Sequence, residues 1–296
     1  MYQLGRLQES IQDYTKAISL KPDFALAKTN LEKAKGKLTN KRTPKIWIVA
    51  AGIDAYESAQ LSPLRSSVAN AFKFKDIFKS ANLAEDQQIE VLHNENADKD
   101  NILATIQSKL CDPGQVYPED MVIFYFVGHG VALGSGNSYG ICPYDYRGLN
   151  KLISEQEILD MLKASPARHK FCLMEACKSK NLPMGGATVS RETLEHYNNS
   201  RKSYSPTTVF LTSAKVGQAS IERDKSGGIF SHYLLLGIKG KADGYGSGKK
   251  DNVISTRELY EYVKANVVRD TGNDQEPQIN PLALQADVPI IPVIEN

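Results

Sequence analysis

Two stretches decide the fold: Met121-Val-Ile-Phe-Tyr-Phe-Val-Gly-His129-Gly130 and His169-Lys-Phe-Cys-Leu-Met-Glu-Ala-Cys177. Each contains a short, continuous apolar run rich in β-branched and aromatic residues, which predicts a strand buried on both faces, at 121–127 and 169–174. Residues 152–164 between them carry apolar residues at helical spacing and predict a helix. A strand, a helix and a strand in this order pair in parallel through a right-handed crossover. Both strands should therefore end at the same edge of one sheet, where open α/β sheets bind ligands.

A histidine and a cysteine, His129 and Cys177, follow these two runs. A free thiol with a pKa of about 8.5 is mostly protonated at neutral pH, and a neighbouring imidazole activates it by taking the proton. The pair therefore predicts a nucleophile and its general base. Gly128 and Gly130 are expected to allow positive φ and close approach of a substrate. The backbone N–H groups of Gly130 and Cys177 are expected to stabilise a developing oxyanion.

Other interpretations of these residues exist. Gly-His-Gly by itself is a common turn, and a cysteine that ends a buried strand is usually an inert core thiol. A zinc site built from His129, Cys177 and Cys142 is a further alternative, but no C-x-x-C or H-x-x-x-H spacing supports it. The catalytic interpretation is favoured because both residues fall at matching strand ends.

The rest of the chain after residue 44 alternates between the two kinds of element. Apolar runs predict strands at 45–52, 89–92, 207–213 and a closing strand at 288–294. Helical spacing predicts helices at 62–81, 98–110, 228–237 and 255–269, with Asp98 and Ser255 as N-caps. This alternation is typical of a doubly wound α/β domain with a parallel sheet.

At its two reactive loops the sequence resembles the caspase-like (clan CD, peptidase C14) cysteine peptidases, in particular the bacterial metacaspase or orthocaspase type. The loops read Gly128-His129-Gly130 and Glu175-Ala-Cys177-Lys-Ser-Lys180. Their His-to-Cys spacing of about 50 is that of caspases. Glu175 stands where the family usually has Asp, and Lys180 where it has glycine. Further segments resemble the family in the same order: 52–56, 138–145, 212–220, 228–237 and 275–278.

The resemblance implies a caspase-like, mostly parallel sheet flanked by helices, in a three-layer α/β/α arrangement. It also implies cleavage after Arg or Lys, because Glu175 matches the acidic pocket position of the metacaspase-like branch. A buried contact between a guanidinium and this carboxylate would select the substrate. Asp145 is a second candidate for the same pocket. Ser213 and Ala214 lie in a segment that, in the family, pairs with the substrate backbone as an added strand.

Residues 181–206 lack apolar periodicity, and a loop of this length inside a compact domain tends to be functional. In caspase relatives an activating cleavage falls here. We therefore expect self-cleavage after Arg191, Arg201 or Lys202, a merely mobile surface loop being the alternative.

Residues 1–38 are predicted to be helical. Gly5, Ser10, Tyr14, Ala17 and Pro22 resemble the second half of a tetratricopeptide (TPR) repeat, and residues 23–38 the first helix of the next. About three repeats are normally needed for stability. The chain is therefore expected to be a piece of a longer protein, or its repeat segment to be a remnant that packs on the next domain. An ordinary helical hairpin is the alternative. This TPR-like segment should bind a protein partner, and the polar residues 39–44 link it to a peptidase domain at 45–296.

Composition and charge exclude several classes of function. The 36 Lys and Arg nearly balance the 34 Asp and Glu, so nothing in the charge favours nucleic-acid binding. Four cysteines in a chain of this length indicate reduced thiols, and no signal pattern or membrane-spanning run appears, so a soluble, cytoplasmic protein is expected. No cofactor or metal is expected either. The loop at 243–254 has Tyr245, Ser247 and Ile254 at three positions where a calcium loop needs oxygen ligands.

These features together predict a cysteine endopeptidase, a thiol protease, that uses His129 and Cys177 to cut proteins after Arg or Lys. Relatives of this kind occur in bacterial defence and cell-death modules. The alternative is a catalytically silent caspase-like scaffold whose TPR-like part mediates protein–protein interaction. Retention of both reactive residues favours the enzyme. The departures from the family pattern at Glu175 and Lys180 keep the scaffold as an alternative.

Overall fold

The computed structural model describes residues 2–21, 23–39, 44–133, 138–178, 208–215, 218–223, 227–246, 248, 250–280 and 289–293. The chain forms two compact units, Met1–Pro44 and Lys45–Asn296. The first unit is a pair of helices, α1 (Tyr2–Leu20) and α2 (Ala25–Thr39), as predicted. Ala27 and Leu31 of this unit are buried, whereas Leu20, Phe24 and Leu26 near the turn are exposed.

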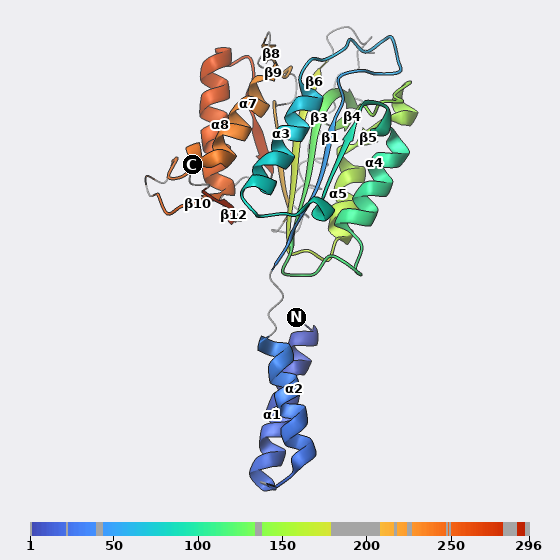
Figure 1. Cartoon of the computed structure of the whole chain (residues 1–296). Helices are drawn as coiled ribbons and strands as arrows, with labels where there is room; N and C mark the ends of the chain where they lie inside the picture. The colour runs from blue at the N-terminus through green and yellow to red at the C-terminus, as the bar shows by residue number, and fades with distance from the viewer. Residues whose placement is uncertain are drawn as a thin grey trace, which may run out of the picture. The chain divides into compact units, whose positions relative to one another are not determined.

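The second unit is built on one sheet (Figure 1). Within the described residues the sheet has eight strands, and its main path runs β11-β7-β6-β3-β1-β2. Neighbours along this path are parallel except β11, which is antiparallel to β7. The strands of this sheet are β1 (Ile46–Gly52), β2 (Ile89–His93), β3 (Met121–Leu133), β4 (Ser138–Ile141), β5 (Ile153–Ser154), β6 (His169–Lys178), β7 (Thr208–Thr212) and β11 (Gln278–Asn280).

Helices cover both faces of the sheet because its strands are apolar at nearly every position. Along β3, Ile123 and Tyr125 belong to one hydrophobic cluster, and Val122 and Phe124 to another. The first face is covered by α3 (Ser67–Ser80), α7 (Ile229–Leu236) and α8 (Thr256–Thr271), and the second by α4 (Lys99–Thr105) and α5 (Glu155–Ala164). This arrangement confirms the predicted three-layer α/β/α fold.

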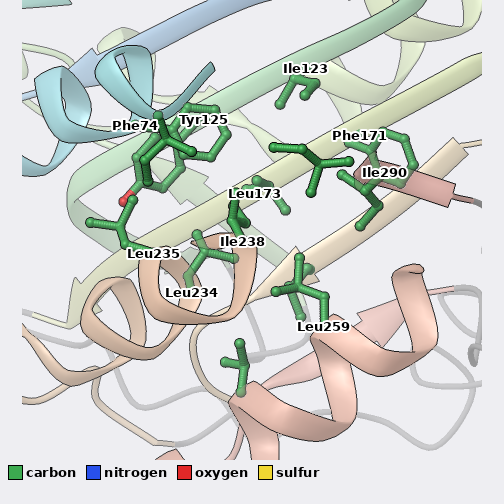
Figure 2. Packing of buried hydrophobic residues seen from close by; sticks show 14 of the residues in the cluster. Phe74, Ile123, Tyr125, Phe171, Leu173, Leu234, Leu235, Ile238, Leu259 and Ile290 are labelled. Atoms are coloured by element: carbon green, nitrogen blue, oxygen red, sulfur yellow. The ribbon is translucent and has the colours of Figure 1, made fainter. Parts of the chain in front are cut away.

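The core of the first face is drawn in Figure 2, where Phe74 of α3 and Tyr125 of β3 stack beside Leu173 of β6 and Leu234 of α7. The rings of Phe74 and Tyr125 lie 4.5 Å apart, centroid to centroid. Each large apolar side chain buried in this way stabilises the fold by about 2 kcal/mol. The strand that leads directly to His129 is therefore held in a packed core on the face that carries Tyr125.

A buried carboxylate fastens the amino-terminal end of the sheet. Asp120 has no exposed surface and accepts hydrogen bonds from the backbone N–H of Lys45 (2.8 Å) and of Tyr117 (3.0 Å). It also accepts the indole N–H of Trp47 at 3.1 Å. The bonds join the start of β1 to the turn that precedes β3.

Helix caps explain where several elements begin. Asp98 accepts the N–H of Asn101, and Ser255 forms a capping box with Glu258, so both predicted N-caps are confirmed. The helix expected from residue 62 begins only at Ser67, so Pro63 lies in the loop that precedes it. Its N-cap residue makes no side-chain cap, and the carboxylate of Asp54 accepts the N–H of Ser67 instead.

Two further predicted elements are present with other details. The helix predicted over 152–164 begins only at Glu155, because Ile153 lies in β5 and Ser154 caps α5 by accepting the N–H of Glu157. The strand predicted at 288–294 is confirmed as β12 (Pro289–Pro292), which pairs with β10 (Val253–Ser255) outside the main sheet. A second small ribbon joins β8 (Glu222–Arg223) to β9 (Gly227–Gly228).

None of the helices in the described part of the chain combines the length and the apolar character that crossing a lipid bilayer requires.

Candidate active site

His129 and Cys177 are direct neighbours on two parallel strands. The ladder between β3 and β6 runs from Met121 and His169 to Gly130 and Lys178, and its register pairs His129 with Cys177. Adjacent strands lie about 4.8 Å apart. Both strands continue beyond the apolar runs from which they were predicted, so the two residues lie within the sheet instead of in loops that follow it.

The ring of His129 is almost fully buried, at 2% exposure. Its Nε2 lies 2.7 Å from the carbonyl oxygen of Ser62, which can only accept, so Nε2 carries the ring proton. Its Nδ1 is buried and has no hydrogen-bond partner among the described residues. In the tautomer with the proton on Nε2, the lone pair lies on Nδ1 and no described residue uses it, which is the arrangement that a general base needs.

Tyr56 holds the other side of His129. The backbone N–H of His129 donates to the Tyr56 hydroxyl at 2.7 Å, and the two ring centroids lie 5.1 Å apart. Neither Tyr56 nor Ser62 was predicted as a site residue. The only sequence signal for Tyr56 was its place in the segment 52–56, which resembles the family. The contact of Ser62 is made by a backbone carbonyl, which leaves no signal in the sequence.

The glycines beside His129 are required by close packing. Neither Gly128 nor Gly130 has positive φ, so that expectation is wrong. A Cβ on Gly128 would lie 2.6 Å from the Tyr56 hydroxyl, and one on Gly130 would lie 2.5 Å from the Cβ of Ala176. The close approach comes from the protein's own side chains. The oxyanion role of the Gly130 and Cys177 N–H groups stays a prediction.

Glu175 has no exposed surface. Its carboxylate accepts the hydroxyls of Ser231 and, at 3.3 Å, Ser220, and it also accepts the backbone N–H of Ser231. It thus caps α7, whose N-cap residue Gly228 has no side chain. Burial raises the pKa of Glu175 to about 7, against the opposing effect of the serine hydrogen bonds.

Gly228 covers this carboxylate. A Cβ at residue 228 would overlap Oε1 of Glu175, so only glycine fits there. The Tyr125 hydroxyl lies 2.6 Å from Oγ of Ser231 and extends the chain of hydroxyls into the sheet. As described, the carboxylate is closed to a ligand, and its predicted role in substrate binding stays a prediction.

Ser213 and Ala214 follow β7 at the same edge of the sheet. Ser213 is buried, its N–H donates to the Met174 carbonyl at 2.9 Å, and its own carbonyl accepts from Gln275 at 2.9 Å. Gln275 also donates to Ser220 at 3.2 Å, so it joins this segment to the partner of Glu175. Both backbone groups of Ser213 have internal partners, whereas Ala214 is half-buried.

Asp145 already has cationic and backbone partners. Its carboxylate accepts the Lys151 ammonium at 2.7 Å and the backbone N–H of Lys99 at 2.9 Å. Burial acts to raise the pKa of Asp145, but these hydrogen bonds outweigh burial and lower it. This carboxylate fixes the start of α4.

The remaining predicted residues have various positions. Arg191, Arg201 and Lys202, together with Lys180, lie outside the described residues. Cys142 is buried, and burial raises its thiol pKa. No group of three or more His, Cys, Asp or Glu side chains within the described ranges is arranged to hold a metal ion. In the loop at 243–254, Asp243 accepts the backbone N–H of Asp251 at 3.1 Å.

Comparison with known proteins gives the following. The family model of the caspase domain (peptidase C14) matches residues 47–289. The protein GSU0716 from Geobacter sulfurreducens is similar in structure, with 16% identity and a TM-score of 0.56 over 85% of this chain and 100% of that chain. The structure of pro-Sf-caspase-1 is also similar, with 11% identity and a TM-score of 0.53 over 80% and 91%. No curated protein matches this sequence.

Proposed function

Because the chain belongs to the caspase-domain family of cysteine peptidases, we propose that it is a cysteine endopeptidase in which Cys177 is the nucleophile and His129 the general base. The observation that carries this proposal is the register that pairs the two residues on adjacent strands, with Nδ1 of His129 buried and unpartnered among the described residues. The bond from Nε2 to Ser62 supports it, because that bond fixes the tautomer in which Nδ1 accepts a proton.

In the proposed reaction, Nδ1 takes the proton of the Cys177 thiol and the sulfur attacks the carbonyl carbon of the scissile peptide bond. The N–H groups of Gly130 and Cys177 stabilise the oxyanion that forms. His129 then gives the proton to the leaving amine. Water hydrolyses the remaining thioester, with His129 again as base.

We further propose that Glu175 selects Arg or Lys at the residue before the cut. Its carboxylate is desolvated and accepts only from serine hydroxyls and a backbone N–H, and no cation in the described part of the chain pairs with it. A guanidinium would supply the missing charge through paired hydrogen bonds. Asp145 suits this role less, since Lys151 already neutralises it. Gly228 would have to move aside to admit the substrate.

The remaining parts of the proposal concern regulation. Ser213 and Ala214 would pair with the substrate backbone, and cleavage after Arg191, Arg201 or Lys202 would activate the enzyme. The TPR-like helices would bind a protein partner. Regulation of this kind fits a bacterial defence or cell-death module acting in the cytoplasm.

The test is labelling with a peptidyl-Arg electrophile, read by intact-mass spectrometry. Three other thiols, of Cys111, Cys142 and Cys172, are buried, and burial raises the pKa of each, so they should not react in the folded protein. One adduct is expected in the wild type and none in Cys177→Ala. A matched control, Cys172→Ala, should keep the adduct. An adduct that survives Cys177→Ala would contradict the assignment of the nucleophile.

Peptide turnover tests the specificity separately. Peptides with Arg or Lys before the cut should be cleaved, and matched peptides with Asp should not. Cleavage of the Asp peptides alone would overturn the role of Glu175 while leaving the dyad intact. If neither class is cleaved and no electrophile reacts, the silent scaffold is the better description.

A further inference from the structure

The loop between β1 and α3, residues 53–66, supplies two residues that hold His129. Tyr56 accepts the backbone N–H of His129 at 2.7 Å, and the Ser62 carbonyl accepts the ring N–H at 2.7 Å. The orientation of the ring therefore depends on the path of this one loop. A loop without regular structure keeps such a path only if its ends are fastened.

Asp54 joins the start of this loop to its end. Its carboxylate accepts the N–H of Ser67 at 2.7 Å and that of Val68 at 3.4 Å, at the first turn of α3. Its backbone carbonyl accepts the N–H of Leu64 at 2.8 Å. One residue at the start of the loop thus binds the end of the loop through side chain and main chain, and closes it around Tyr56 and Ser62.

Asn94 fastens the same point to the neighbouring strand. Its Oδ1 accepts the N–H of Asp54 at 3.0 Å and that of Ala55 at 3.1 Å. Asn94 has φ of +44°, a conformation that asparagine and glycine adopt most readily. The closed loop is therefore held against the turn that follows β2, beside the edge at which His129 lies.

We propose that Asp54 is a positioning residue for the general base: by closing the 53–66 loop it sets the Ser62 carbonyl against Nε2 of His129. This inference rests on the proposed function for its effect on catalysis. Its effect on the state of the ring does not depend on that function. A His129 ring in the other tautomer, or one turned away from Cys177, cannot take the thiol proton.

Four variants of the full chain test the proposal. Asp54→Ala removes the closure, and Asp54→Asn keeps an oxygen that can accept the N–H of Ser67. Asn94→Gly removes the second fastening while it tolerates positive φ and leaves the start of α3 intact. The matched control is Ser255→Ala, which removes the N-cap of α8 instead of α3 and so costs a helix cap without touching the loop.

The first readout is kinetic, with a peptidyl-Arg substrate. Asp54→Ala is expected to lower kcat by about 10- to 100-fold with KM changed by less than about twofold. Asp54→Asn should recover most of the rate, Asn94→Gly should lose about 10-fold, and Ser255→Ala should match the wild type. If the wild type cleaves the substrate, equal rates for Asp54→Ala and Ser255→Ala would overturn the proposal.

The second readout is the ring-nitrogen NMR spectrum of His129, recorded with isotopically labelled histidine in the Cys177→Ala background. The wild-type loop should give the tautomer protonated at Nε2. Asp54→Ala and Asn94→Gly should each give a mixture of tautomers, and Asp54→Asn and Ser255→Ala should not. An unchanged ring in both loop variants would overturn the proposal even if the enzyme proved inactive. If Asp54→Ala does not fold, Asn94→Gly decides the question.

Discussion

Replacement of Glu175 by glutamine should stabilise the protein, and the gain should depend on pH. Glu175 has no exposed surface and no cationic partner among the described residues, so its ionised form is penalised by lost hydration. Glutamine has nearly the same shape and keeps an oxygen for the Ser231 hydroxyl. The substitution therefore removes the ionisable proton while it leaves the packing in place.

The magnitude follows from the pKa. Burial raises the pKa of Glu175 from 4.5 to about 7. Between these two pH values the unfolded chain is ionised at this residue while the folded protein holds the proton, so stability falls as pH rises through this window. Each pKa unit corresponds to about 1.4 kcal/mol, which makes the full effect about 3 kcal/mol above pH 7. Below about pH 4.5 the effect vanishes, because both states are protonated.

The assay is urea unfolding followed by circular dichroism, in the Cys177→Ala background to prevent self-cleavage. The free energy of unfolding is measured for the protein with Glu175 and for its Glu175→Gln variant, between about pH 4.5 and about pH 8. The difference between the two should increase by about 3 kcal/mol across this range in favour of glutamine. Groups that do not interact with the Glu175 charge titrate equally in both proteins and cancel. A difference that stays constant with pH would refute the reasoning.

Three further predictions concern other parts of the structure. Gly228→Ala should destabilise the protein by more than about 1 kcal/mol and lower activity, because its Cβ overlaps the Glu175 carboxylate; urea unfolding and peptide turnover measure both effects. Asp120→Ala should cost about 3 kcal/mol in the same unfolding assay, since it abolishes three hydrogen bonds to a buried carboxylate, whereas the control Asp86→Ala removes only exposed ion pairs and should change little. For a peptide with Arg before the cut, KM should fall as pH rises through about 7, because ionised Glu175 binds the cation; a neutral citrulline peptide whose KM shows the same dependence would contradict this.

Much of the fold could be predicted because apolar runs mark buried strands directly. The runs at 121–127 and 169–174 gave the two central strands and their parallel order, and the structure confirms both. The extensions to Leu133 and Lys178 could not be predicted in the same way. Gly128-His129-Gly130 carries no apolar signal, and this part of β3 is a strand because β6 and β4 pair with it.

The candidate site divides along similar lines. His129 and Cys177 could be placed side by side from the order of the strands alone. The partners of His129 could not, because Tyr56 and Ser62 are distant in sequence, and a backbone carbonyl is a property of every residue. Glu175 was identified by resemblance, but its burial and its capping of α7 depend on packing that no local pattern encodes.

The chain contains a single tryptophan, Trp47, and its surroundings make it a natural optical probe. The indole is 6% exposed and bonded to Asp120 at the start of β1, whereas the loop that holds His129 leaves the opposite end of that strand. Its fluorescence should therefore shift to longer wavelength when the sheet unfolds and stay unchanged when only the edge that carries the candidate site is disturbed. Emission spectra alone would then distinguish a variant that has lost its fold from one that has lost its chemistry.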